Sequence, residues 1–208
     1  MRVVALILSI LFCACSAPSN HYIIEGTTSM SDGYYYLYKG YDLVDSAQVI
    51  DGKYRFENEV DTLIPTRNIS NMKLNNPWLS PRLATVILDS GTIRVSEDDN
   101  SVTGGLVVSG TKGNEALRNF AIKGHQIQEA AEYAFIPEQR EKLAKEYAKL
   151  VKKTIEKNLD NFAGLYILLA SGDRFSDEQK AKYLDRLSPA MQKTTATQIL
   201  RAQIKTDN

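Results

Sequence analysis

Residues 45–56 read DSAQVIDGKYRF, two alternating segments joined by Asp51-Gly52. An Asp-Gly pair tolerates the positive φ angles of a two-residue type I′ turn, so the flanking segments are predicted to form a hairpin. The expected register pairs Ile50 with Lys53, Val49 with Tyr54, Gln48 with Arg55 and Ala47 with Phe56. Because side chains alternate along a strand, this register predicts one apolar face made of Ala47, Val49, Tyr54 and Phe56.

Strand-like segments extend from this hairpin in both directions, over residues 22–110. This region is rich in Tyr, Val, Ile and Thr, and Gly, Pro, Asn and Asp divide it into short runs. The predicted strands are 22–28, 34–39, 44–50, 53–60, 66–72, 84–88, 92–96 and 102–108. We therefore expect an antiparallel β-sandwich-like module.

Helical spacing replaces the alternating pattern over residues 111–208, where Ala, Glu, Lys, Gln and Leu dominate. Asn114 is predicted to cap the first helix, and Pro137 separates that helix from a second one. Residues 162–170 are apolar nearly all round, which predicts a buried helix, and Ser176 with Gln179 forms a capping box for the next one. The fold class is thus α+β, a β-sandwich-like module followed by a C-terminal helical bundle.

The N-terminus resembles the signal of a bacterial lipoprotein. Arg2 precedes an apolar stretch at residues 3–12, and Phe12-Cys13-Ala14-Cys15 resembles a lipobox, although Phe12 stands where Leu is usual. We expect residues 1–14 to be a cleaved signal peptide, Cys15 to carry the lipid, and residues 15–21 to form a flexible tether. No acidic residue directly follows Cys15, which favours a protein held in the outer membrane and facing the periplasm.

A resemblance to a known family rests on several short motifs. Residues 44–47 (VDSA) and 51–56 (DGKYRF) are similar to the signature of a β-rich domain of unknown function. Further matching pieces are residues 23–26 (IIEG), residues 107–110 (VVSG) and Asn114. That domain is found at the N-terminus of bacterial lipoproteins that carry a thioredoxin-like thiol-disulfide oxidoreductase domain.

The family's oxidoreductase activity does not transfer to this chain. It depends on a Cys-x-x-Cys pair, in which one thiolate attacks and the other resolves the mixed disulfide. Here Cys13 and Cys15 are the two cysteines, and both lie in the expected signal. We therefore expect a non-catalytic accessory module in the cell envelope, which binds a partner protein, within a thiol-redox or stress pathway.

Composition and motif searches argue against several other functions. The 25 basic and 25 acidic residues balance, so no global field attracts nucleic acid. Residues 105–112 resemble a phosphate loop, but Thr111 and Lys112 stand in reversed order. His21 and His125 lack a second ligand at metal-binding spacing, so neither a metal nor a cofactor is expected. An enzyme of unrecognised type remains an alternative.

Aromatic residues and two short sequons supply the remaining candidates. Tyr34, Tyr36, Tyr38 and Trp78 are candidate binding residues, because aromatic rings stack on sugars and peptides. They support the alternative of a glycan- or peptide-binding lipoprotein, although alternating Tyr side chains are also ordinary in strands. Ser46 and Thr62 follow Asp and precede an aliphatic residue, which makes them candidate O-glycosylation sites.

Overall fold

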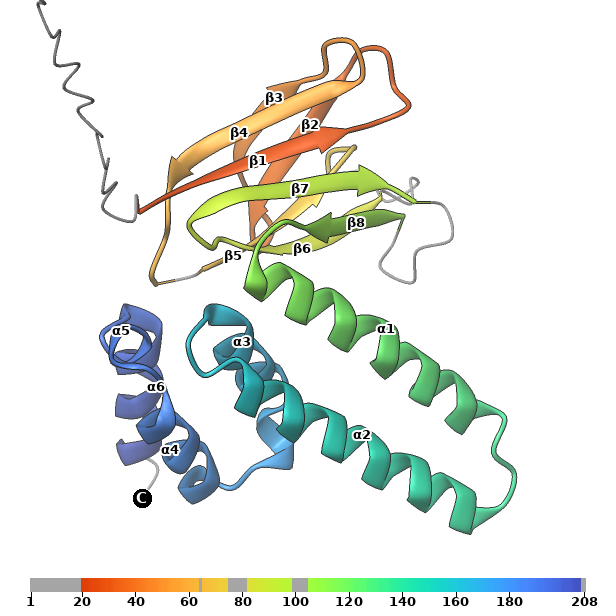
Figure 1. The fold of residues 1–208 in the computed structure, drawn as a ribbon, viewed down its shortest axis with the longest axis vertical. Coiled ribbons are helices and arrows are strands. Elements are labelled where there is room, and N and C mark those ends of the chain that lie inside the picture. The colour runs from red at the N-terminus through yellow and green to blue at the C-terminus, as the bar shows by residue number, and fades with distance from the viewer. Residues whose placement is uncertain (1–19, 64, 75–81, 99–104, 207–208) are drawn as a thin grey trace, which may run out of the picture.

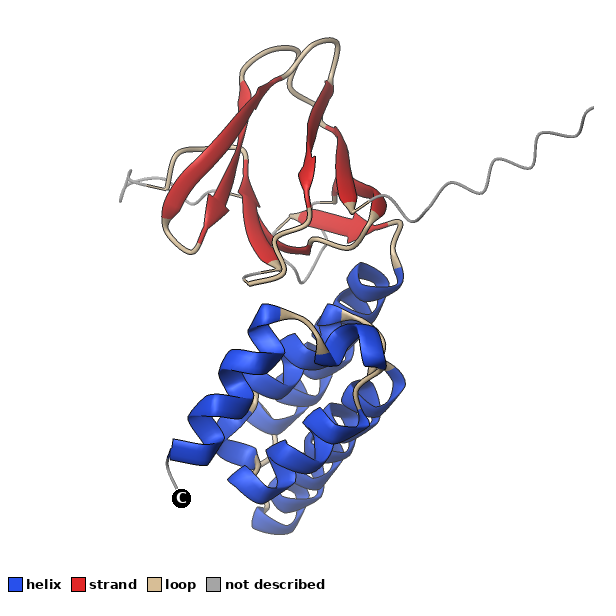
Figure 2. Cartoon of the chain, turned by 90° about the vertical axis from the view of Figure 1, so that its left-hand side faces the viewer, coloured by secondary structure: helices blue, strands red, loops and turns tan. Residues whose placement is uncertain are grey.

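The computed structural model describes residues 20–63, 65–74, 82–98 and 105–206, and within these ranges a β-sandwich precedes a helical region (Figure 1). All strands lie in one half of the molecule and all helices in the other (Figure 2). The predicted α+β class is thereby confirmed. The signal peptide, Cys15 and Trp78 lie outside the described residues.

Two four-stranded sheets form the sandwich. One has the order β4-β1-β7-β8 and the other β3-β2-β5-β6. Their strands are β1 (His21–Thr27), β2 (Tyr34–Lys39), β3 (Asp42–Gln48), β4 (Lys53–Glu59), β5 (Thr66–Ser70), β6 (Leu83–Ile87), β7 (Gly91–Glu97) and β8 (Leu106–Ser109). The buried side chains of both sheets alternate with exposed ones and fill the space between the sheets, among them Ile24, Tyr35, Leu37, Ile69, Val86, Ile93 and Leu106.

The Asp51-Gly52 turn forms as predicted, but the hairpin ends after one pair. Asp51 and Gly52 have φ angles of 50° and 70°, and Ile50 and Lys53 exchange both backbone hydrogen bonds, at 2.9 and 3.0 Å. Beyond that pair β3 joins β2 and β4 joins β1, so the predicted pairing of residues 47–49 with residues 54–56 is wrong. The turn therefore passes the chain from one sheet to the other. Ala47, Val49, Tyr54 and Phe56 nevertheless share the buried face, as predicted.

One strand pair departs from the antiparallel pattern expected for the whole module. β1 and β7 run parallel, with Ile24 opposite Ile93 and Gly26 opposite Val95. A parallel pair cannot be joined by a tight turn, and 63 residues separate Thr27 from Gly91 along the chain (91 minus 28). Local sequence therefore gives no signal for this pairing.

The helical region consists of α1 (Lys112–Glu132), α2 (Pro137–Lys157), α3 (Phe162–Ala170), a short 3₁₀ turn η1 (Gly172–Arg174), α4 (Asp177–Arg186), α5 (Pro189–Gln192) and α6 (Thr195–Thr206). The capping box of Ser176 and Gln179 and the buried α3 are confirmed. In Figure 1, α1 and α2 form a long hairpin that extends away from the sandwich. We call this element the α1–α2 hairpin.

Asn114 does not cap α1, because Thr111 is the N-cap residue. Instead Asn114 lies in the first turn, is 1% exposed, and bonds to both backbone groups of Ile87 in β6. Its Oδ1 accepts from the Ile87 N–H at 2.9 Å, and its Nδ2 donates to the Ile87 carbonyl at 2.8 Å. The Asn114 amide thus bonds to the edge of β6 as the backbone of a neighbouring strand would.

Asn114→Ala is expected to lower the free energy of unfolding by about 1–3 kcal/mol, because it removes the side-chain acceptor of the buried Ile87 N–H and leaves the Ile87 carbonyl with the Asp89 N–H alone. Chemical denaturation measures this loss. Asn119→Ala removes the same side chain from an exposed position of α1 and should change stability by less than about 0.5 kcal/mol. Equal effects of the two substitutions would contradict the role assigned to Asn114.

Candidate functional site

The aromatic candidates do not form one surface. Tyr34 is 47% exposed and Tyr36 is partly buried, with ring centroids 6.4 Å apart and ring planes tilted by 31°. Tyr38 is 3% exposed, and its hydroxyl accepts a hydrogen bond from the Leu74 N–H at 3.1 Å. Tyr38 therefore belongs to the core. The Tyr34–Tyr36 pair remains the candidate contact for glycan or peptide binding.

The two O-glycosylation candidates differ in exposure. Ser46 is exposed on β3, an edge strand, and pairs across the sheet with Tyr36. Thr62 is partly buried, and its carbonyl accepts a hydrogen bond from the Ala196 N–H of α6 at 3.2 Å. Ser46 is thus the more accessible acceptor, and modification at both positions stays a prediction.

A polar cluster around Glu97 closes one end of the sandwich. The Glu97 carboxylate accepts hydrogen bonds from the Thr28 hydroxyl at 2.6 Å, the Tyr35 hydroxyl at 2.9 Å, and both the N–H and the hydroxyl of Ser29 at 2.9 and 2.7 Å. Arg82 lies 3.5 Å from the same carboxylate. The cluster joins β7 to the β1–β2 connection. Sequence reasoning missed it, because its members are far apart along the chain.

The hydrogen bonds of this cluster keep Glu97 ionised. Burial alone would raise the pKa of Glu97, but the bonds from Thr28, Ser29 and Tyr35 outweigh burial and lower the pKa to about 2. Burial raises the pKa of Tyr35 to about 12, so its hydroxyl stays protonated and can donate. A carboxylate fixed in this way has no proton to give near neutral pH. The cluster is therefore structural.

Tyr54 packs against this cluster. Its ring stacks on the Tyr35 ring at a centroid distance of 3.9 Å, and it covers Gly26 on the neighbouring strand, where a Cβ atom would lie 1.8 Å from the ring. Its buried hydroxyl has no hydrogen-bond partner among the residues that the structure describes. Burial also raises the pKa of Tyr54 strongly. Gly26, one of the family-like motif residues, is thus required by the close approach of an aromatic ring.

The α1–α2 groove is a different kind of site. It has a volume of about 1210 Å³ and runs along the α1–α2 hairpin. Its apolar floor is formed by Ala116, Phe120, Ile127 and Ala130 of α1 and by Leu143 and Leu150 of α2. These residues recur every three to seven positions, so they follow one face of each helix. Helical periodicity was visible in the sequence, but it did not show that this face stays uncovered.

Lysines surround the floor of the α1–α2 groove. Lys112, Lys123, Lys149, Lys153 and Lys157 line it, together with one acidic residue, Glu146. Lys112 pairs with Asp160. Among the described residues, no salt bridge involves the other four lysines. Since the whole chain carries no net charge, this positive excess is local.

Other polar groups of the groove are engaged within the helices. The Thr154 hydroxyl donates to the Leu150 carbonyl at 2.8 Å, and the Asn158 amide donates to the Thr154 carbonyl at 2.8 Å. The Asn158 side-chain oxygen accepts from Asn161 at 2.9 Å. These groups hold α2 and the start of α3 in place, and the charged groups exposed in the lining are the lysines and Glu146.

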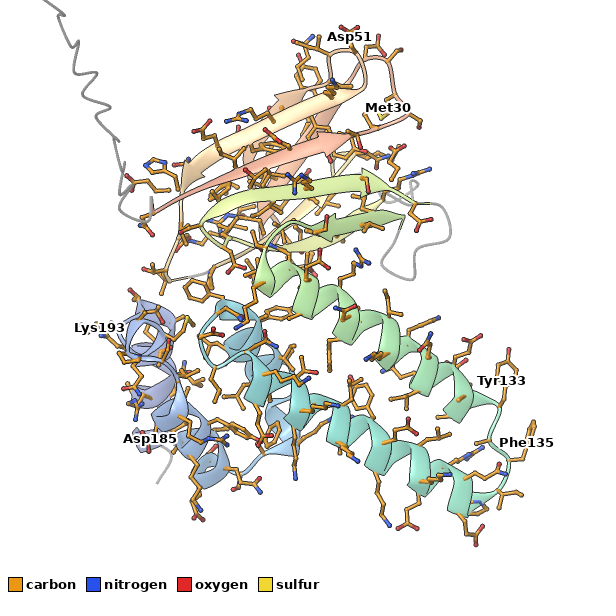
Figure 3. The ribbon with its side chains drawn as sticks, viewed as in Figure 1. Met30, Asp51, Tyr133, Phe135, Asp185 and Lys193 are labelled. Carbon is orange, nitrogen blue, oxygen red and sulfur yellow. The ribbon has the colours of Figure 1, made fainter. Side chains whose placement is uncertain are left out.

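The tip of the α1–α2 hairpin exposes large apolar side chains. Tyr133 is 72% exposed, Phe135 is 85% exposed and Ile136 is 52% exposed. Figure 3 shows Tyr133 and Phe135 pointing away from both helices, at the opposite end of the molecule from Met30 and Asp51. An apolar tip of this kind is typical of a contact surface for another molecule.

A second concavity, of about 840 Å³, lies on the sandwich and is lined by residues of β1, β4 and β7, with Ala47, Gln48, Ile50 and Ser109. Three cations line it, Lys53, Arg55 and Arg94, and of these Arg55 bonds to Glu25 at 2.7 Å and to Glu57 at 2.8 Å. The charge of Arg55 is therefore satisfied within the protein, in contrast to the lysines of the α1–α2 groove.

No cluster of three potential ligands drawn from His, Cys, Asp and Glu occurs in the described ranges. None of the helices placed there has the length and apolarity that crossing a bilayer requires.

Comparisons with known proteins agree with the resemblance of the β-rich region. The model of a family described as "Domain of unknown function (DUF4369)" matches residues 22–117. This range contains the described strands and ends in the first two turns of α1, so it includes Asn114 and its partner Ile87. No curated protein and no solved structure matches the chain.

Glu97 should make the stability of the protein depend on pH in acid. Because its folded-state pKa lies below its unfolded value, the stabilisation is complete above about pH 5 and is lost as the pH falls toward 2. Denaturation curves of Glu97→Gln should show a smaller loss of stability over this range than the unmodified protein. Glu57→Gln, at an exposed position, is the control. Parallel pH curves for Glu97→Gln and the unmodified protein would refute this assignment.

Proposed function

We propose that this protein is a lipid-anchored lipoprotein of the bacterial envelope that acts without catalysis, by docking a partner protein on the α1–α2 hairpin. The observation that carries the proposal is the α1–α2 groove, with its apolar floor and its lysines. Protein-binding surfaces combine an apolar centre with a polar rim in this way. The exposed side chains of Tyr133 and Phe135 lie at the tip of the same hairpin.

The side chains of the α1–α2 groove support binding over chemistry. The hydroxyl of Thr154 is bonded to a backbone carbonyl of its own helix, so it is not poised as a nucleophile. Glu146 is the acidic group in the lining, and the lysines there are exposed. The ammonium groups of these lysines attract anions.

The proposed location in the envelope rests on the signal-like N-terminus. His21, where β1 begins, is six residue steps after Cys15 (21 minus 15), so an anchored tether would reach at most about 20 Å. In Figure 1 the start of β1 and the tip of the α1–α2 hairpin lie on opposite sides of the molecule. An anchor at Cys15 would therefore leave the hairpin free to meet a partner in the periplasm.

The proposed pathway is thiol redox or a stress response. Support comes from the resemblance of residues 44–56 to the N-terminal module of thioredoxin-containing lipoproteins and from the family match over residues 22–117. In this account the chain contributes the accessory module, and the chemistry belongs to its partner.

Cys15→Ser should abolish incorporation of a labelled fatty acid and should release the protein from the membrane fraction. The reason is that the acyl chain attaches to this sulfur. Cys13→Ser is the matched control, because it changes the neighbouring cysteine within the expected signal and should leave labelling intact. Labelling that survives Cys15→Ser, or that is lost only in Cys13→Ser, would overturn the proposed lipid anchor at Cys15.

Photo-crosslinking in intact cells tests the docking surface. A photoreactive amino acid at Gln126, which lines the α1–α2 groove, should give an adduct with another envelope protein. The same amino acid at Gln128, an exposed position of α1 outside the groove, should give little or none. Equal adducts at both positions, or no protein adduct at Gln126, would contradict docking at the groove.

A further inference from the structure

The charge of the α1–α2 groove specifies the chemistry of what binds there. Five lysines and one glutamate give the lining an excess of four positive charges (5 minus 1), although the whole chain is neutral. Among the residues that the structure describes, Asp160 is the one salt-bridge partner of these lysines, and it pairs with Lys112 at the sandwich end. Farther along the two helices, Lys123, Lys149 and Lys153 form no salt bridge with a described residue and are available to carboxylates of a partner. The occupant is therefore expected to be acidic.

The walls of the groove indicate which backbone conformation a bound segment must have. Both walls are α-helices, whose backbone N–H and carbonyl groups are bonded within each helix, so an extended peptide would find no strand edge to pair with. A helix satisfies its own backbone and needs only side-chain contacts. Two helices side by side form the cradle into which a third helix packs.

The length of the groove also fits a helix. Its lining on α1 runs from Lys112 to Ala130, which spans about 27 Å at 1.5 Å per residue. That distance corresponds to about 18 residues of a bound helix. The apolar floor has Phe120 and Ile127 on α1 opposite Leu143 and Leu150 on α2, so it can contact an apolar stripe along the whole occupant.

The packing of α1 explains why this cradle is open. The buried residues of α1 are Gly113, Asn114 and Gly124, none of which is a large apolar residue. Its Phe120 is only partly buried and contacts the Tyr147 ring at a centroid distance of 6.1 Å. A helix of 21 residues whose large apolar side chains are at most partly buried has apolar surface left for a partner.

We infer that the α1–α2 groove binds an acidic amphipathic helix of a partner protein, whose apolar face contacts Phe120, Ile127, Leu143 and Leu150 and whose carboxylates pair with Lys123, Lys149 and Lys153. This inference rests on the proposed docking function and specifies the occupant. The lysines orient the helix and accelerate its encounter, while the apolar floor supplies most of the contact area.

A designed peptide of about 20 residues tests the inference, with Leu along one helical face and Glu on the flanks. The mature chain should bind this peptide in a fluorescence anisotropy titration, and binding should weaken as salt is added. A second peptide with each Glu replaced by Lys should bind at least about tenfold more weakly. Equal binding of the two peptides, or binding of neither, would overturn the inference.

Paired protein variants locate the binding. Lys149→Glu combined with Lys153→Glu reverses two charges in the groove and should weaken binding of the acidic peptide by about tenfold or more. Lys142→Glu with Lys145→Glu makes the same change on exposed positions of α2 outside the groove and should leave binding within about twofold. Equal losses in both double variants would refute the assigned site.

The outcomes separate this inference from the proposed function. Vesicles of phosphatidylglycerol that bind in a Lys149- and Lys153-dependent way, while the acidic peptide does not, would assign the lysines to lipid and contradict a helical occupant. A protein adduct from Gln126 whose crosslinked segment is neither acidic nor helical would leave docking intact and reject the acidic helix. Failure of the Gln126 crosslink itself rejects the docking function.

Discussion

The bidentate contact between Asn114 and Ile87 is the interaction on which the rest of the structure depends. Asn114 follows β8, the last strand of one sheet, and Ile87 ends β6, the edge strand of the other sheet. One side chain therefore joins the two sheets and fixes the first turn of α1 at the same time. The Asp89 carboxylate, which accepts the Gly113 N–H at 2.9 Å, reinforces the same turn. A Cβ atom at Gly113 would overlap that carboxylate, so any other residue there would displace the Asp89 side chain and weaken this hydrogen bond.

This anchored first turn explains how the α1–α2 hairpin can extend from the sandwich. Because α1 is held at its start, and by contacts with α2 and α3, it can leave a face uncovered. The uncovered face becomes the floor of the α1–α2 groove, and the lysines stand around it. The sandwich, whose own polar cluster at Glu97 is internally satisfied, serves as the rigid base. Structure and proposed function are thus divided between the two parts of the chain.

Local chemistry predicted much of the fold, while long-range contacts determined the site. The Asp51-Gly52 turn was predictable because its positive φ angles need these residue types, but its strands separate because β1 and β2 offer longer pairings. Asn114 was predicted to cap α1 because capping and pairing with a strand edge use the same side-chain amide. In the structure the Thr111 hydroxyl caps α1 by accepting the Asn114 N–H. The Glu97 cluster and the open face of α1 depend on residues far apart in sequence, so no pattern in the chain could show them.

The central claim is that Asn114 holds the α1–α2 hairpin in one orientation on the sandwich, and a distance between spin labels tests it most directly. Labels can be placed at the exposed positions Lys53 and Gln128 once Cys13 and Cys15, the two cysteines of the chain, are replaced by Ser. Pulsed electron resonance should then give a single narrow distance distribution, which broadens when Asn114→Ala is added. A broad distribution with Asn114 present, or a distribution that Asn114→Ala leaves unchanged, would contradict the account.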